Sequence, residues 1–509
     1  MFRSTIWHTI IYTIINVAIQ VFGGLLFAIL LSRIKKGRVA LQTLYYIPVV
    51  ISSVAICQIF TKLFSVTPIG IINQILSFVN PSFKFMEWIS NPQISLYVTA
   101  FVEAYKYLGL YMVIFYAALI GVPDELGEAA LIDGAAVWQE YLYVKIPYIK
   151  PVIIANCLLV LNGSLRSFEF SYLLTHGGPG NASELMTTYM YKQAFSSMKY
   201  GYGSSVAIMI VIICMVVGLL FRKFSGEGKM NEKEKSFHFG IIKWVIALLL
   251  VIMQVYPFFY VFTSSFKSLD DFRKLPAYAL PSKWVLTNFI NVFTKSHMPT
   301  YFKNSIIVLI GVLVPLLLFA LMAGFALSKI KFKGRKVILN YFLLGLMLPM
   351  QVALIPLFSI FNKMGLINTY PAIILPQIAF SLSYSIQLFY SFNKFFPEEM
   401  LEAAIIDGCS PMGCFFKMVV PMALNSIITV ATMQAVFCWN EYINAYTFTR
   451  STDMKTITLG LNDFVGSMGL TDWGATFAAI TVTVLPVFIF YFFSSKKMLA
   501  GMTAGAVKG

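Results

Sequence analysis

Charged residues and cysteines are scarce in this sequence, and both shortages limit the classes of protein to which it can belong. Charged residues make up only 12% of the 509 residues, whereas 58% are hydrophobic. Soluble globular domains carry about 25% charged residues. The six cysteines show no CxxC spacing, and most lie in apolar segments, where cysteine behaves as a small hydrophobic side chain. The composition therefore argues against a set of soluble domains, a disulfide framework or a metal site.

A nucleotide-binding loop is also missing. Such a loop requires the pattern G-x-x-x-x-G-K-[ST] between a strand and a helix, so that backbone N–H groups can cradle the phosphates. The only Gly-Lys pair, Gly228-Lys229, is followed by Met230. We therefore expect no ATP site, no cofactor and no covalent chemistry in this chain.

Long apolar runs, in contrast, recur throughout the sequence. Each is long enough to cross a bilayer as a helix, which predicts an all-α polytopic membrane protein. We count eleven transmembrane helices, five before the middle of the chain and six after it. The predicted spans lie near residues 6–31, 41–64, 94–120, 151–174, 204–221, 241–264, 304–327, 337–361, 371–395, 422–448 and 473–493.

The distribution of basic residues predicts the orientation of these spans. The formal net charge is +16, from 38 Lys+Arg against 22 Asp+Glu. In a membrane protein such an excess marks cytoplasmic loops rather than a nucleic-acid partner. Arg33, Lys35, Lys36 and Arg38 follow the first span, whereas Arg3 alone precedes it. We therefore expect the N-terminus outside the cell and the C-terminus in the cytoplasm.

One stretch of the chain occurs twice without a gap. Residues 123–147 read PDELGEAALIDGAAVWQEYLYVKIP, and residues 397–421 read PEEMLEAAIIDGCSPMGCFFKMVVP. Equivalent residues are 274 positions apart (402 − 128 = 274). Each copy predicts a helix, a sharp turn and a second helix, with Gly134 or Gly408 in the left-handed conformation that ends the first helix. Two copies in register indicate a duplicated architecture.

The repeated stretch resembles the cytoplasmic coupling loop of bacterial ABC importer permeases. The pattern is Glu-Ala-Ala, three residues, Gly, and a proline preceded by apolar residues. The family usually has Ile and Leu before that proline, whereas this chain has Val144 and Ile146, and then Met418 and Val420. The resemblance implies that two ABC ATPase subunits dock on these loops. The residues that it assigns to ATPase coupling are Glu128, Ala129, Ala130, Asp133 and Gly134 in the first loop and Glu402, Ala403, Ala404, Asp407 and Gly408 in the second.

Further motifs are similar to those of carbohydrate importers in the same family. The first half contains THGGPG from Thr175, although the family usually has glycine at the position of His176. The second half contains WNEY from Trp439 and the C-terminal tail GMTAGAVKG, residues 501–509. In the family this tail reaches the ATPase dimer, which implies that role for Gly501, Thr503, Gly505 and Lys508. The resemblance also implies a bacterial plasma-membrane location, a sugar or oligosaccharide substrate and an extracellular binding protein that delivers it.

These features divide the chain into two permease modules. The first module covers residues 1–221 with about five spans, and the second covers residues 240–509 with six. Residues 222–239 form a charged linker, in which Met230 resembles the start of a separate polypeptide. We therefore expect two joined subunits whose parallel modules are related by an axis along the membrane normal. The first module resembles a permease without its opening helix.

Polar residues inside two predicted spans form the candidate substrate pathway. A charged side chain within a span costs about 2.5–3.5 kcal/mol on insertion scales, so each one requires a reason. In the fourth span, helical spacing predicts one polar stripe formed by Asn162, Arg166 and Glu169. The tenth span predicts a similar stripe formed by Asn440, Asn444 and Thr447, next to Trp439, Glu441, Tyr442 and Tyr446. Polar groups beside aromatic faces suit a sugar, but hydrogen bonding between helices explains these residues equally well.

Two further interpretations are open at this stage. Glu103 and Lys106 lie three residues apart in the third span, which favours a mutually neutralising pair on one helix face. Within the importer class, the substrate could instead be a polyol or a glycerol-phosphate-like solute. An ion-coupled secondary transporter would also carry charges inside the membrane, but it would not require duplicated coupling loops.

Overall fold

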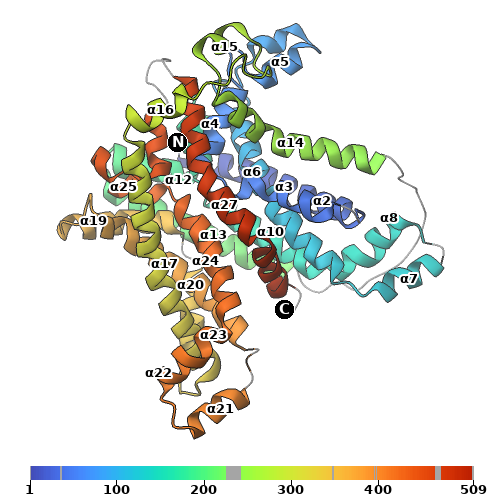
Figure 1. The fold of residues 1–509 in the computed structure, drawn as a ribbon, viewed down its shortest axis with the longest axis vertical. Coiled ribbons are helices and arrows are strands. Elements are labelled where there is room, and N and C mark those ends of the chain that lie inside the picture. The colour runs from blue at the N-terminus through green and yellow to red at the C-terminus, as the bar shows by residue number, and fades with distance from the viewer. Residues whose placement is uncertain are drawn as a thin grey trace. The chain divides into compact units, whose positions relative to one another are not determined.

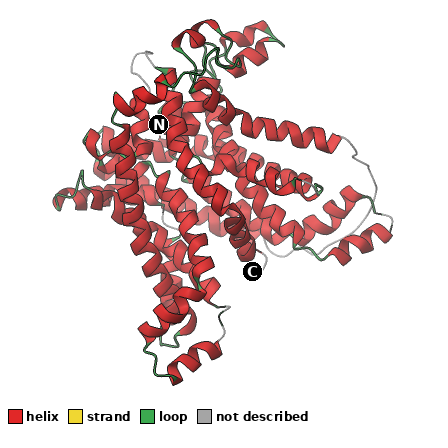
Figure 2. Ribbon diagram, viewed as in Figure 1, coloured by secondary structure: helices red, strands yellow, loops and turns green. Residues whose placement is uncertain are grey.

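The computed structural model of this chain describes residues 2–34, 37–133, 135–224, 242–346, 349–394, 396, 398–464 and 472–506. Within these ranges all regular elements are helices, as the composition predicts (Figure 2). Most of the predicted linker, including Met230, lies outside the described residues.

The described residues contain six helices that are long and apolar enough to cross a membrane. Four further pairs of helices pass the same test together but are bent by more than 40°. The predicted span at 241–264 corresponds to α14 (Ile242–Ser264). The eleven predicted spans all fall on helices, of which up to ten in the described part of the chain pass the test for a span, and the chain is a multi-pass membrane protein.

The described residues form two compact units. Unit 1 contains residues 1–295 and 463–484, and unit 2 contains residues 296–462 and 485–505. The main helices of unit 1 are α1 (Phe2–Val17), α2 (Gly24–Ser32), α3 (Arg38–Val50), α4 (Ser53–Leu63), α5 (Ile71–Ser77), α6 (Ser95–Ile120), α7 (Asp124–Ile132), α8 (Val137–Gln139), η3 (Glu140–Lys145), α9 (Ile146–Tyr148), α10 (Lys150–Leu165), α11 (Glu169–Thr175), α12 (Met186–Tyr191), α13 (Tyr200–Phe224), α14, α15 (Leu269–Lys274) and α16 (Thr287–Thr294).

Unit 2 repeats much of this order. Its helices are α17 (Met298–Lys329), α18 (Arg335–Gly345), α19 (Met350–Lys363), α20 (Tyr370–Asn393), α21 (Glu398–Ile406), α22 (Pro411–Cys414), η5 (Phe415–Val419), α23 (Val420–Met422), α24 (Leu424–Trp439), α25 (Ile443–Phe448), α26 (Ile457–Gly460) and the second part of α27 (Trp473–Ala506). In this unit α21 and α22 lie beyond the ends of α17, α20 and α24 (Figure 1).

The two compact units do not follow the sequence repeat at α14. This helix belongs to the second predicted module, but it packs in unit 1 against α3 and α2. The Tyr105 hydroxyl donates to the Gln254 carbonyl at 2.8 Å, and the Gln254 amide donates to the Tyr105 carbonyl at 3.3 Å. These buried bonds satisfy polar groups inside an apolar environment, where an unpaired group would be costly.

Several predicted spans are bent or broken rather than straight. The second span bends by 96° between α3 and α4, where the Ser52 hydroxyl caps α4 by accepting from the Ala55 N–H at 3.2 Å. The eighth bends by 93° between α18 and α19. The fourth and tenth spans are interrupted at residues 166–168 and 440–442, so the continuous helices expected there are wrong.

Candidate coupling loops and intramembrane helix breaks

The two coupling loops share one backbone path in one register. Adding 274 to the bounds of α7, α9 and α10 gives the bounds of α21, α23 and α24. Each loop also contains a π-helical segment, η3 or η5, before its proline. π-helical segments are rare and often mark functional positions. The helix, turn and helix predicted for each copy are therefore present in both modules.

The turn that ends α21 has the conformation predicted for glycine. Gly408 has a φ of +79°, and the Cys409 N–H donates to the Ala404 carbonyl at 2.9 Å. A side chain at a left-handed position is unfavourable, which explains the glycine. The equivalent Gly134 lies outside the described residues.

Charged groups anchor the first coupling loop to the end of α2. Glu140, only 8% exposed, pairs with Arg33 at 3.5 Å and also with Lys145. The guanidinium of Arg33 lies 4.5 Å from the centre of the Tyr141 ring, and the Tyr141 hydroxyl lies 2.7 Å from the Ser32 hydroxyl oxygen. These contacts fix the second half of the loop, and sequence reasoning overlooked all of them.

The second coupling loop is anchored by apolar packing instead. Phe415 and Val419 are buried in a core with residues of α17 and α20. The Phe415 ring lies 6.0 Å from the Phe325 ring, measured between centroids. Cys414, which is equivalent to Glu140, is also buried. One backbone path is therefore held by two different kinds of contact.

Both loops expose apolar side chains at the same four positions. The exposed fractions are 86% for Ile132 and 85% for its equivalent Ile406. The other equivalent pairs are Leu126 with Met400, Trp138 with Met412 and Leu142 with Phe416. Neighbouring residues from the predicted coupling set are also exposed, namely Glu128, Ala129, Asp133, Glu402, Ala403, Asp407 and Gly408, whereas Ala130 is half-buried and Ala404 is buried. Each loop therefore presents a mixed apolar and acidic surface.

The helix break in unit 1 contains two predicted pathway residues. α10 ends at Leu165, Arg166 is its C-cap, and α11 begins at Glu169. The Arg166 guanidinium donates to the Asn162 carbonyl at 2.9 Å. The polar stripe predicted along one helix is therefore wrong, because the helix ends inside it. Asn162, Arg166 and Glu169 are all half-buried.

Other polar groups hold this break in place. The Ser167 hydroxyl donates to the Glu103 carboxylate, which also accepts from the Tyr12 hydroxyl at 2.6 Å. The Ser167 carbonyl accepts from the Thr187 hydroxyl on α12. Lys106 donates to the Ser53 hydroxyl at 2.8 Å. Glu103 and Lys106 thus bond to different partners, and the ion pair expected between them is wrong.

The break in unit 2 occupies the equivalent position. α24 ends at Trp439, and α25 begins at Ile443. The backbone angles match those of the first break: Tyr442 has φ −120° and ψ −46°, and its equivalent Phe168 has φ −130° and ψ −51°. The Trp439 carbonyl accepts from the Thr458 hydroxyl at 2.8 Å. A second polar stripe along one helix is therefore also wrong, because Asn440 lies in the break.

The predicted pathway residues of unit 2 differ in exposure. Asn440 and Glu441 are half-buried, whereas Tyr442 and Asn444 are buried. The Tyr442 ring stacks on the Tyr446 ring at 5.4 Å, and its hydroxyl accepts from the Asn462 amide at 3.0 Å. The equivalent rings in unit 1, Phe168 and Tyr172, stack at 4.9 Å. The duplication therefore extends to aromatic pairs that position each break.

Comparison with known protein families identifies the family to which this chain belongs. The model of the family described as "Binding-protein-dependent transport system inner membrane component" matches residues 20–226 and 316–498. The chain belongs to this family. It is therefore an ABC importer permease, a membrane component rather than an enzyme, as the coupling-loop motifs predict.

Each of the following relatives matches about half of the permease. It is 35% identical over 283 residues to "Probable ABC transporter permease protein YurM" of Bacillus subtilis, covering 56% of this chain and 93% of the relative. It is 32% identical over 271 residues to "Diacetylchitobiose uptake system permease protein NgcG" of Streptomyces coelicolor, covering 53% and 89%. It is 32% identical over 275 residues to "Arabinooligosaccharides transport system permease protein AraQ" of Halalkalibacterium halodurans, covering 53% and 98%. These proportions fit a permease made of two joined modules.

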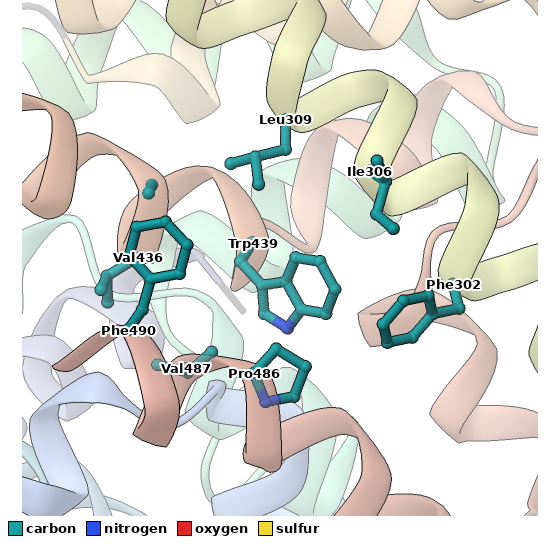
Figure 3. A pocket seen from close by; sticks show the side chains of 9 residues that line it. Phe302, Ile306, Leu309, Val436, Trp439, Pro486, Val487 and Phe490 are labelled. Atoms are coloured by element: carbon teal, nitrogen blue, oxygen red, sulfur yellow. The ribbon is translucent and has the colours of Figure 1, made fainter. Parts of the chain in front are cut away.

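An apolar cavity of about 200 Å³ adjoins the second break of the permease. Figure 3 shows the Trp439 indole facing Pro486, with Phe302 and Phe490 nearby. The other lining residues are Ile306, Leu309, Ala435, Val436 and Val487. Sugar hydroxyls require polar partners, so this cavity does not fit the predicted substrate.

Two further motifs named from the sequence, THGGPG and the C-terminal tail, lie partly within the described residues. His176 follows α11 with a φ of 50°, which explains why glycine suits this position. Burial, together with the nearby charge of Lys192, lowers the pKa of the His176 imidazole. At the C-terminus α27 continues as helix to Ala506, through Gly501, Thr503 and Gly505, whereas Lys508 lies outside the described residues.

Proposed function

We propose that this permease forms the transmembrane pathway of an ATP-driven importer for a sugar or oligosaccharide. The observation that carries the ATP-driven part is the matched set of exposed apolar side chains on the two coupling loops. A patch of this kind with a polar rim is typical of a protein interface. We assign one ATPase subunit to each loop, because the two surfaces are equivalent and the chain has no nucleotide-binding loop of its own.

The substrate class rests on the relatives and on the chemistry near the breaks. The names of two relatives refer to diacetylchitobiose uptake and to arabinooligosaccharide transport. Amide, carboxylate and aromatic groups lie together near residues 440–446, which suits both the hydroxyls and the CH faces of a sugar. A polyol or a glycerol-phosphate-like solute is the alternative within this class. An extracellular binding protein would deliver the substrate.

The helix breaks supply the proposed translocation pathway. Irregular backbone at membrane depth is tolerated only where protein buries it or where it lines a water-filled cavity. Asn162, Glu169 and Asn440 are half-buried, which supports the second arrangement. Tyr442 is buried and bonded to Asn462, so helix packing explains this residue better. We therefore assign sugar contact to Glu169 and Asn440 before Tyr442.

The orientation and the C-terminal tail belong to the same proposal. An outer N-terminus and a cytoplasmic C-terminus place both coupling loops in the cytoplasm, where ATP is available. The end of α27 and the residues after it would then reach the ATPase dimer. A reporter that is active only in the cytoplasm, fused to either end, tests this orientation, and activity at the N-terminus would contradict it.

Co-purification with the cognate ATPase subunits tests the docking surfaces. Placing a charge at an exposed apolar position, as in Ile132→Asp or Ile406→Asp, should reduce ATPase recovery and abolish ATP-dependent uptake. Ile75→Asp is the matched control, because Ile75 is 53% exposed on α5, which the orientation places outside the cell. Normal assembly of both loop variants would overturn the docking proposal.

Uptake into proteoliposomes tests the function as a whole. Sugar uptake should require ATP, the ATPase subunits and the binding protein, whereas uptake driven by an ion gradient alone would favour a secondary transporter. Single cysteines at positions 162, 169, 440 and 442 should then be labelled by a small water-soluble thiol reagent, with protection by substrate. If none is labelled in any state of the cycle, the breaks serve only in helix packing.

A further inference from the structure

We infer that one carboxylate per module stabilises the intramembrane helix break of that module. Of two positions that are equivalent in the modules, the first module carries the carboxylate at one and the second module carries it at the other. In the first module it is Glu103 on α6, and in the second it is Glu441 within the break itself. We assign both as positioning residues. The expected effect on transport rests on the proposed pathway through the breaks. The support of the breaks by these two carboxylates does not depend on that pathway.

In the first module the carboxylate holds the break from the side. Glu103 is only 5% exposed, and its carboxylate accepts from two hydroxyl groups. It accepts from Ser167 in the break and from Tyr12 on α1, at 2.6 Å. The carboxylate therefore ties α1, α6 and the break together. The N-cap residue of α11, Phe168, provides no side-chain cap, and the carboxylate contacts the break through the Ser167 hydroxyl instead.

In the second module the carboxylate holds the break from its end. The Glu441 oxygens accept from the backbone N–H groups of Asn444, at 2.7 Å, and Ala445, at 3.3 Å. These N–H groups lie in the first turn of α25, where no helical carbonyl is available to them. A carboxylate is favourable there because the helix N-terminus carries partial positive charge. The two breaks thus have the same backbone but different supports.

The repeat shows that the two supports occupy exchanged positions. Adding 274 to 103 gives Gln377, and adding 274 to 167 gives Glu441. The first module therefore has Glu103 on the neighbouring helix and Ser167 in the break. The second module has Gln377 on the neighbouring helix and Glu441 in the break. Gln377 is buried and donates to the Ile373 carbonyl on its own helix at 3.1 Å. Each module therefore has one carboxylate over these two positions.

This interchange predicts that the first module can adopt the support of the second. In the variant with Glu103→Gln the break loses its charge-assisted bond. Adding Ser167→Glu places a carboxylate three and four residues before Phe170 and Ser171, as Glu441 lies before Asn444 and Ala445. The double variant should therefore regain a supported break, although each of its substitutions removes a native group.

Amide hydrogen exchange of the full chain in detergent tests this support without transport. Glu103→Gln should speed exchange at residues 165–171 about tenfold, as expected for the loss of a charge-assisted hydrogen bond, and leave residues 443–448 unchanged. The double variant should restore slow exchange. Ser167→Ala removes only the hydroxyl, so it gives the same local test if Glu103→Gln does not insert. Unchanged exchange in the single variants, or no recovery in the double variant, overturns the inference.

Uptake kinetics then test the role in transport. At equal membrane level and equal ATPase recovery, Glu103→Gln should raise the KM for substrate about tenfold, and the double variant should recover most of that change. Exchange that responds while KM and maximal rate stay constant would overturn the positioning role. If the wild-type chain imports no sugar, the proposed function fails, and the exchange result still decides whether the carboxylates support the breaks.

Discussion

In the first module charges anchor the coupling loop, whereas in the second module the equivalent positions are packed in an apolar core. Glu140 pairs with Arg33 and Lys145, and its counterpart Cys414 is buried beside Phe415. Even so, α7 and α21 have equivalent bounds, and the exposed apolar positions coincide. The anchor can therefore change as long as the backbone path and the outer surface are kept.

The difference in anchoring has a physical consequence. Arg33 is 28% exposed, so salt in solution partly screens its attraction to Glu140. Apolar packing around Phe415 is not weakened by salt in this way. The first loop should therefore respond to ionic strength, and the second should respond to side-chain volume.

Removing volume from the second anchor should have the largest effect. Phe415→Ala leaves a cavity in the core formed with Phe325 and Val419, and substitutions of this kind cost about 3–5 kcal/mol. We expect a lower thermal unfolding midpoint in detergent and poor ATPase coupling. Phe415→Leu is the control and should lose much less. Equal behaviour of the two variants would show that packing does not anchor this loop.

Changing the turn of the second loop should have the next largest effect. Gly408→Val places a β-branched side chain at a φ of +79°, which costs about 1–2 kcal/mol or more. ATP-driven uptake should fall while membrane insertion stays normal. Since a Cβ at this position would meet no atom of this chain within 4 Å, the substitution causes no clash within the fold. Gly408→Asn should retain more activity, because asparagine tolerates this conformation, and the reverse order would argue against it.

Removing the charge from the first anchor should have a smaller, salt-dependent effect. Glu140→Gln weakens the contacts with Arg33 and Lys145, and partly exposed ion pairs contribute about 1 kcal/mol or less. We expect reduced coupling at low ionic strength and a smaller difference from wild type at high salt. Cys414→Ala at the equivalent position is the control and should show no salt dependence. A salt-independent defect in Glu140→Gln would contradict the ionic anchor.

The smallest expected effect is a gain in stability at the outer end of the first break. His176 adopts a φ of 50°, which glycine adopts without a steric penalty. His176→Gly should therefore increase the free energy of unfolding by about 1 kcal/mol or less, and it should raise the thermal midpoint slightly. Arg450→Gly at the equivalent position of the second module is the comparison, because Arg450 is not among the residues with positive φ. A larger gain there would show that φ is not the cause.

Local properties of the sequence were enough to predict the class and the repeat. The length of the apolar runs places a helix at each of the eleven spans, since this property depends only on consecutive residues. The left-handed turn at Gly408 follows from the glycine and its neighbours. The register of the two modules follows from the constant spacing of Glu128 with Glu402 and Asp133 with Asp407. The resemblance to ABC importer permeases rested on these same local motifs.

Only the tertiary structure decided where the fourth and tenth spans break and what holds the breaks. Residues 166–168 and 440–442 contain neither proline nor glycine, so nothing local to the chain marks an interruption. The groups that make the breaks tolerable come from distant positions: Glu103 bonds to Tyr12, 91 residues away, and Thr458 reaches the carbonyl of Trp439. A helix is favoured at every position when these partners are left out. A broken span becomes stable only where other helices supply hydrogen bonds to its free backbone and polar side chains.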